Sequence, residues 1–530
     1  MSGNSEVLEG APARLMKASA DAPRLWLWLT LGLAVAHAAL VFASPMPPLH
    51  DYPGHLARIH IMTRLGDSAL LQSYYDYTWL LRHNTGSDLL IFLLAHVMPI
   101  EVAGRLVVAA IPASTLMALW WIRTKVHGRC DSLVLLAAPY AMGVWYSWGF
   151  VNYCLSVALA LLAFALWLEI RRWKLAPRSA ALFGLGFIVW IAHLSGWGVL
   201  GLMVFGWEWV AAMEQRRSSD VRQFLLALRD AVWRCLPLAA PVLAMLLTPD
   251  GGGAGLGARF DFTQKLTAPL WSLAFTWDRA DKYCVALLAV FAGAALALRL
   301  TRLSAGLALA GTLIMIVFLL SPAELFGGGS VDVRLLTPFA LVAATALTWR
   351  RDLRAHWAAA AVVAITLGLV AVNVGRFAYT AAAFQRYNAE IAANLALIEP
   401  MPRGARVLGI VVDGLNGGRP PLTMLPSMSV VRRDAYSNLQ WQADAGHTLR
   451  LTYPPDSDPL VGSESTIVDL DADGRSTGAL DRLIAAEPLH RFDYVWIVNT
   501  HRAPEPSDGR LQLVGRTERT ALYRIVASQP

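Results

Sequence analysis

Residues 25–58 read LWLWLTLGLAVAHAALVFASPMPPLHDYPGHLAR, an apolar run followed directly by a stretch dense in titratable groups. The run has the length of about 20 residues that a membrane-spanning helix needs. In the polar stretch, Asp51 lies between His50 and His55, Arg58 follows, and the intervening Pro-Gly pair predicts a fixed turn. These groups at a lipid–water boundary suit acid–base chemistry, and the stretch is interpreted as an active-site loop. The alternative is a polar interfacial loop that only stops the helix from sliding.

The composition is that of a membrane protein. Of 530 residues, 56% are hydrophobic and 16% are charged, which is far too apolar for a soluble domain. The net charge of +7 comes mostly from Arg and Lys in short loops between apolar runs. Membrane topology explains that placement, so nucleic acid is excluded as a partner. The four cysteines show no CxxC spacing, and neither a zinc site nor a disulfide framework is indicated.

Apolar windows predict about eleven membrane-spanning helices. The short apolar stretch 87–99 is interpreted as re-entrant or interfacial, and His193–Gly198 as a break between two spans. Basic clusters follow alternate spans, which places them in the cytoplasm together with an N-terminal tail, residues 1–24, that leads into an uncleaved first helix. The predicted spans are 25–44, 101–122, 131–148, 150–169, 179–213 (two spans), 235–248, 283–298, 303–320, 334–348 and 357–374.

The same topology divides the chain into three parts: the tail, a transmembrane domain over 25–376 and an outer domain over 377–530. It collects the loops 45–100, 249–282 and 321–333 on the outer face. The Gly-rich start of loop 249–282 predicts mobility, as in substrate-gating loops, and a solvated hairpin without a role is the alternative.

The outer domain is predicted to be a linker helix followed by a soluble α/β fold. Strands are expected at 407–412, 494–498, 511–514 and 521–526, and a helix at 477–487. Asp469–Asp473 resembles a calcium loop but lacks the glutamate that an EF-hand needs, so it is interpreted as a turn. The fold class is therefore mainly α, a polytopic helical bundle with a C-terminal α/β domain.

The first outer loop holds the candidate catalytic residues. Asp51 beside a low-dielectric region is the candidate general base, and His50 and His55 either orient it or act as the base themselves. Arg58 is placed to meet a phosphate or to pair with Asp51. A metal held by His50, Asp51 and His55 is a weaker alternative because no fourth ligand is in view.

Further candidates lie in other outer segments. Asp76 and Trp79 belong to an aromatic patch that suits either a sugar site or a membrane interface. Asn152 and His193 are polar groups at helix ends near membrane depth, which usually marks a site or a pathway, although His193 also suits a helix break. Arg334 begins a span from outside and is placed to bind a phosphate or to form an interfacial pair with Asp332.

The layout resembles the C-type (GT-C) superfamily of integral-membrane glycosyltransferases. The resemblance is carried by His50-Asp51 after the first helix, the helix over 56–65, the short apolar stretch 87–99 and the Pro402–Leu408 stretch. The chain departs from many members in carrying Asp51-Tyr52 where they carry Asp-Glu or Asp-Asp. It is also similar to an uncharacterised bacterial membrane-protein group with an Asp-x-Pro-x-His-Leu-Ala-Arg stretch and a Gly-Phe-x-Asn-Tyr stretch, matched here by Gly149–Tyr153.

The resemblance implies inverting transfer of a sugar from a polyprenyl-phosphate carrier to a glycan, lipid or protein acceptor, at the periplasmic face of a bacterial inner membrane. It implies that Asp51 deprotonates or orients the acceptor hydroxyl, and that Arg334 with Arg259 or Lys265 holds the donor phosphate. No cofactor is indicated with certainty, and a divalent cation is an open expectation. Two rival functions are a transporter or flippase of a lipid-linked or polar substrate and a non-catalytic subunit of a polysaccharide assembly complex.

Overall fold

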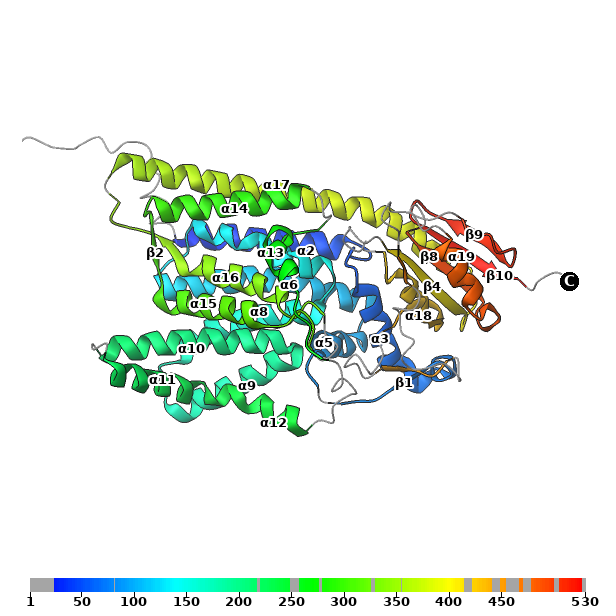
Figure 1. The fold of residues 1–530 in the computed structure, drawn as a ribbon, viewed down its shortest axis with the longest axis horizontal. Helices are drawn as coiled ribbons and strands as arrows, with labels where there is room; N and C mark the ends of the chain where they lie inside the picture. Colours follow the sequence, from blue (N-terminus) through cyan, green and yellow to red (C-terminus); the bar gives the residue numbers. More distant parts are fainter. Residues whose placement is uncertain are drawn as a thin grey trace, which may run out of the picture.

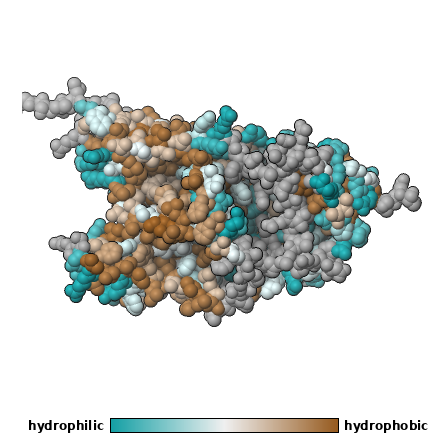
Figure 2. Space-filling view, in the orientation of Figure 1, coloured by the Kyte–Doolittle hydropathy of each residue, from teal (hydrophilic) through white to brown (hydrophobic). Residues whose placement is uncertain are grey.

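In the computed structural model, a long helical bundle carries a strand-containing domain at one end (Figure 1). The structure describes residues 23–80, 82–216, 220–247, 257–275, 279–325, 329–353, 355–413, 422–440, 449–453, 467–469, 478–499 and 505–526. The N-terminal tail up to residue 22, the Gly-rich start of loop 249–282 and residues 470–473 of the rejected calcium loop lie outside these ranges. Figure 2 shows a hydrophobic surface over the bundle, with hydrophilic residues gathered toward its ends.

Within the described residues, seven helices are long and apolar enough to cross a membrane. The chain is therefore a multi-pass membrane protein that is mainly helical, as predicted. Shorter apolar helices complete the bundle: α5 (Gly86–Ala95), α12 (Ala240–Leu247), α15 (Ala305–Leu320) and α16 (Leu336–Ala346). The seven are α2 (Pro23–Ala43), α6 (Ile100–His127), α8 (Val151–Ile170), α9 (Leu175–Ala192), α10 (Leu194–Arg216), α14 (Arg279–Ala297) and α17 (His356–Ile398).

Two predicted spans are wrong as continuous helices. Residues 131–148 form the 3-10 segments η2 (Ser132–Leu136) and η3 (Ala138–Met142) and one helical turn, α7 (Val144–Ser147). A proline inside this segment removes a backbone donor and breaks the helix. Likewise 235–248 is split, because amphipathic α11 (Val221–Cys235) ends at the 3-10 segment η4 (Leu236–Ala239), which contains a proline, before α12 begins.

The break between α9 and α10 falls at His193, as predicted. His193 is extended, and its ring Nδ1 accepts a hydrogen bond of 3.0 Å from the Ser195 backbone N–H at the start of α10. By contrast, no helix boundary occurs at residue 376, because α17 continues for 43 residues as one helix. The last span and the expected linker helix are thus a single rigid element that reaches the C-terminal domain (Figure 1).

At the far end of the bundle from that domain, loops distant in sequence meet. Strand β2 (Thr301–Leu303) pairs antiparallel with β3 (Leu347–Trp349). Buried Arg123 donates to Asp131 at 2.6 Å, and Asp131 also accepts from Thr348 at 2.6 Å. The basic loops that the charge rule assigned to one face therefore lie at one end of the molecule.

The C-terminal domain is built on a mixed sheet of order β5-β4-β8-β10-β9, with β7 also pairing with β4. The predicted strands and the predicted helix, now α19 (Ala479–Ala486), are all present. The strands are β4 (Arg406–Asp413), β5 (Tyr436–Ser437), β7 (Ile467–Asp469), β8 (Tyr494–Val498), β9 (Leu511–Arg516) and β10 (Thr520–Ile525).

The domain is docked on the segment between α2 and α6. Strand β1 (Tyr75–Tyr77) pairs antiparallel with β6 (Leu449–Leu451). Helix α3 (Tyr52–Arg64) packs against α18 (Met428–Arg433), and His60 of α3 bonds Asp434 at 2.8 Å. The helix that begins after Asp51 is therefore held from both the bundle and the C-terminal domain.

Candidate active site

Asp51 is the residue that precedes α3, and its carboxylate is not used as a helix cap. Its Oδ1 instead lies 2.5 Å from His50 Nδ1. An aspartate at this position commonly bonds the free N–H groups of the first helical turn, and Asp51 makes no such bond. The positive end of the helix dipole still favours its negative charge. The predicted pair of acid and imidazole is thus formed, with the carboxylate side chain 14% exposed.

The segment before α8 fixes this turn. The backbone N–H groups of His50 and Asp51 donate to the carbonyls of Ser147 and Trp148 at 3.0 and 2.9 Å. Gly149, at φ +77°, lies so close that a Cβ there would be 2.7 Å from the Asp51 backbone nitrogen. The His50 ring stacks on Trp148. The two short motifs of the sequence, around Asp51 and around Gly149, are therefore two halves of one site.

Arg334 approaches the same site from η6 (Val333–Leu335), the turn before α16. Its guanidinium lies over the Phe150 ring, 4.6 Å from the centroid, and it interacts electrostatically with Asp51. One guanidinium nitrogen donates to the Gly329 carbonyl at 2.7 Å, whereas Nε is buried without a hydrogen-bond partner among the described residues. A cationic group with one unpartnered donor among the described residues therefore lies within electrostatic range of the acid.

His193 lies beside Arg334, with 3.5 Å between its Nε2 and Arg334 Nη1. Because Nδ1 accepts the Ser195 N–H, the neutral ring carries its proton on Nε2. Two N–H donors then face each other, and an anionic oxygen placed between them would accept from both. The His83 ring lies beside the His193 ring, with 6.5 Å between the two ring centroids. The buried Nδ1 of His83 has no hydrogen-bond partner within the described part of the chain. Burial lowers the pKa of His83.

His55, Arg58 and Asn152 belong to a buried network beside the site, centred on Asp88 of α5. Arg58 donates to Asp88 Oδ2 through Nη2 at 2.7 Å and through Nε at 3.1 Å. Arg58 Nη2 lies 2.9 Å from His55 Nδ1, and Asn152 accepts from the Ser87 backbone N–H at 2.7 Å. These side chains join α3, α5 and α8, and they therefore fix the start of the helix that follows Asp51.

Two other predicted phosphate ligands are engaged elsewhere. Lys265 of α13 (Phe262–Trp271) is buried, bonds the carbonyls of Phe318 and Ser321 at 2.7 Å each, and pairs with Asp332 at 2.7 Å. Exposed Arg259 pairs with Glu324 at 2.5 Å. Of the proposed phosphate ligands, Arg334 is the one that the structure brings to Asp51.

The aromatic patch lies outside the site. Asp76 is exposed on β1, and its Oδ1 accepts from the Tyr77 backbone N–H at 2.8 Å. Trp79 is 55% exposed and packs on Tyr77 and Phe92. Exposed aromatic rings of this kind are typical of a membrane interface, which favours that alternative over a sugar site.

Several residues of the site were missed from the sequence: Asp88, His83, Trp148 and Phe150. Asp88 is the single acid within the apolar stretch 87–99, and an ionisable residue in such a stretch signals a buried partner. No comparable signal marks His83 or the two rings. Tyr52, the residue after Asp51, is fully buried against Gly104 of α6. Within the site, His50 is the side chain paired with the acid.

Two observations limit what the site holds. Among the described residues, no group of three or more His, Cys, Asp or Glu side chains is arranged to hold a metal ion. Participation of a divalent cation stays a prediction.

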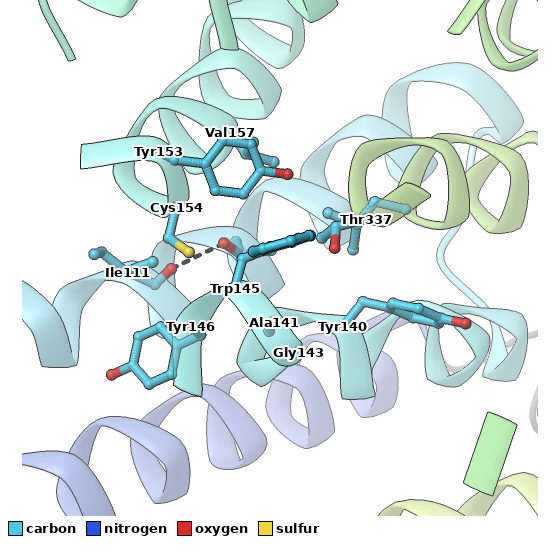
Figure 3. A pocket seen from close by; sticks show the side chains of 12 residues that line it. Ile111, Tyr140, Ala141, Gly143, Trp145, Tyr146, Tyr153, Cys154, Val157 and Thr337 are labelled. Carbon is cyan, nitrogen blue, oxygen red and sulfur yellow. Dashed lines mark hydrogen bonds between the residues drawn. The ribbon is translucent and has the colours of Figure 1, made fainter. Parts of the chain in front are cut away.

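Beside the site, Trp145, Tyr153 and Cys154 line a cavity of about 20 Å³ (Figure 3). This volume suits about one water molecule, so a sugar ring does not fit inside the bundle there.

A multi-pass helical bundle with an acidic turn after its first helix and an α/β domain docked beside it has the fold of the GT-C membrane glycosyltransferases. One solved structure with this fold is ArnT from Cupriavidus metallidurans in the apo state, a GT-C glycosyltransferase. It matches with a TM-score of 0.51 at 12% identity over 96% of this chain and 99% of that chain.

ArnT from the same organism bound to undecaprenyl phosphate matches with a TM-score of 0.45 at 14% identity, over 95% and 98% of the two chains. No protein-family model and no curated protein sequence matches this chain. The resemblance stated from the sequence is confirmed at the level of the fold.

Proposed function

We propose that this protein transfers a sugar from a polyprenyl-phosphate carrier to an acceptor hydroxyl at the periplasmic face of the membrane. The observation that supports it most directly is that the His50–Asp51 pair lies within electrostatic range of the Arg334 guanidinium. A base and a phosphate-binding cation are the two groups that such a transfer needs.

Asp51 is assigned as the base. As the acceptor oxygen bonds to the anomeric carbon, the carboxylate accepts the hydroxyl proton, and the bond from that carbon to the carrier phosphate breaks with its electron pair going to the phosphate oxygen. Attack on the face opposite the leaving group inverts the anomeric centre. His50 positions the carboxylate through the 2.5 Å contact, and its stacking on Trp148 fixes the ring.

Arg334 and His193 are assigned to the carrier phosphate. Their facing N–H donors offer two hydrogen bonds to one phosphate oxygen, and a buried guanidinium stabilises the negative charge that develops on the leaving group. The Phe150 and Trp145 rings beneath the guanidinium restrict its orientation. The lipid chain enters from the side, where the bundle surface is hydrophobic (Figure 2).

The transfer step is tested by Asp51→Asn, with Asp67→Asn as the matched control. Asp67 lies after α3 in the same outer segment, and its side chain is 73% exposed. Lipids from producing cells are measured by mass spectrometry, and we expect a polyprenyl-phosphate sugar to accumulate with Asp51→Asn and to be consumed with the wild type and Asp67→Asn. Equal consumption by all three proteins would exclude Asp51 as the base.

Donor binding is tested separately with undecaprenyl phosphate as the probe in native mass spectrometry of the purified full chain. Arg334→Gln is expected to weaken binding at least tenfold, because a hydrogen bond to a charged group contributes about 1.5–3 kcal/mol. Arg259→Gln, which removes an exposed arginine, is the control. A transporter or flippase would bind the carrier without consuming its sugar. In that case the Asp51 experiment would show no consumption of the polyprenyl-phosphate sugar by the wild type.

A further inference from the structure

A second cleft lies at the opposite end of the bundle from the His50–Asp51 site. It has a volume of about 1180 Å³ and is bordered by the C-terminal ends of α6 and α10, the β2–β3 pair and the start of α15. Figure 2 shows this end of the molecule hollowed, at the left of the view. A cleft of this size accommodates a small amphiphilic molecule. None of the residues assigned to sugar transfer lines it.

The lining is strongly basic, and we name it the basic cleft. Arg129, Arg171, Arg302 and Arg351 line it, against one acidic residue, Glu214. Part of this charge is already balanced, because Arg171 lies 3.7 Å from Glu208 and Arg302 lies 3.2 Å from Asp352. Asp352 also pairs with Arg350 at 2.8 Å, so one carboxylate serves two arginines. The cleft therefore keeps an excess of positive charge.

One further feature favours an anion. The start of α15 lines the cleft, and its N-cap residue Ser304 makes no side-chain cap bond. Helix N-termini favour negative charge.

The apolar part of the lining comes from α6, α10 and β2, with Val126, Val210 and Leu303 among its residues, and polar residues such as His127 and Gln215 lie beside it. A cleft that combines cationic groups with an apolar wall at a helix end matches an amphiphile with an anionic head. We infer that the basic cleft binds the phosphate headgroup of an anionic phospholipid, whose acyl chains lie along the apolar wall. The lipid lies at the end of the bundle opposite the sugar-transfer site, in the leaflet of the membrane that borders the basic loops.

The test is native mass spectrometry of the detergent-solubilised full chain with phosphatidylglycerol, phosphatidylcholine and inorganic phosphate as separate probes. The variant Arg302→Gln with Arg351→Gln removes two exposed cations from the lining. The matched control, Arg299→Gln with Arg350→Gln, removes two cations from the same two loops outside the lining.

We expect phosphatidylglycerol to bind the wild type more tightly than phosphatidylcholine, and the lining variant to weaken that binding about 30-fold while the control changes it less than about threefold. Equal loss in both variants would mean that diffuse charge attracts the lipid, and the inference would be wrong. No preference for phosphatidylglycerol over phosphatidylcholine would also overturn it. Inorganic phosphate binding as tightly as phosphatidylglycerol would show that the cleft takes a free anion and not a lipid.

Discussion

Arg58 either belongs to a structural network or binds substrate. Replacing its partner Asp88 with Asn tests which of these two roles Arg58 has. Arg58 is 2% exposed and the Asp88 side chain 5% exposed, and two N–H groups of Arg58 reach the same carboxylate oxygen. Asp88→Asn keeps the shape of the side chain but removes the carboxylate charge that pairs with the buried guanidinium. Breaking a buried pair in this way costs about 3–5 kcal/mol.

The assay is thermal unfolding of the purified full chain in detergent, in which this loss lowers Tm by several degrees. The double variant Arg58→Met with Asp88→Asn removes both charges, so it is expected to be markedly more stable than the sum of the two single changes predicts. Additive losses across the cycle would show that the two charges do not stabilise one another.

Activity gives the second arm. If Arg58 holds only the helix that begins after Asp51, the folded double variant retains most of its sugar transfer. If Arg58 instead binds the donor phosphate, as the sequence suggested, the double variant folds and is inactive, and the structural assignment is refuted.

Gly149 and Asp434 provide two other tests. Gly149→Ala is expected to reduce sugar transfer strongly, because the new Cβ would meet the Asp51 backbone nitrogen at 2.7 Å and the residue has a φ of +77°. The control is Gly198→Ala, where a Cβ would have nothing within 4 Å. Unchanged transfer by Gly149→Ala would contradict the close approach of Gly149 to Asp51. Asp434 bonds His60, and this bond, with an arginine partner, lowers the pKa of the carboxyl from 3.8 to about 2. A lowered pKa stabilises the fold above pH 4, and this contribution of about 2 kcal/mol is lost as the pH falls from about 4 to 2. Urea unfolding at several pH values should show a weaker acid dependence for Asp434→Asn, and an identical dependence would refute the assignment.

The amino-acid sequence by itself determined the membrane class, the order of the spans and the α/β end domain. Hydrophobic length and the position of basic clusters are local properties, and the burial of apolar helices in a membrane depends on them directly. The break at His193, the short helix over 86–95 and the strands of the C-terminal sheet were all visible in this way. The two broken spans were missed because their apolar length predicts a crossing helix, whereas proline within each span interrupts it.

The site was only partly accessible from the sequence. Asp51 and His50 are adjacent in the chain, so their pairing required no knowledge of the fold. Knowledge of the fold was needed to distinguish Arg334 from Lys265. Arg334 lies within electrostatic range of Asp51, whereas Lys265 is bound to carbonyls at a helix end. Both are basic residues in predicted outer segments, and their sequence context does not differ in kind.

What only the tertiary structure decided is which polar groups are already satisfied. Arg58 and Asp88 lie 30 positions apart, and Asn152 joins them from a third helix. Whether a buried charge is free for a substrate depends on the partner that packing brings to it, and packing brings together residues from helices far apart in the chain. The sequence thus determined which stretches are apolar enough for membrane helices and which acid precedes α3, and the three-dimensional packing decided which cation lies near that acid.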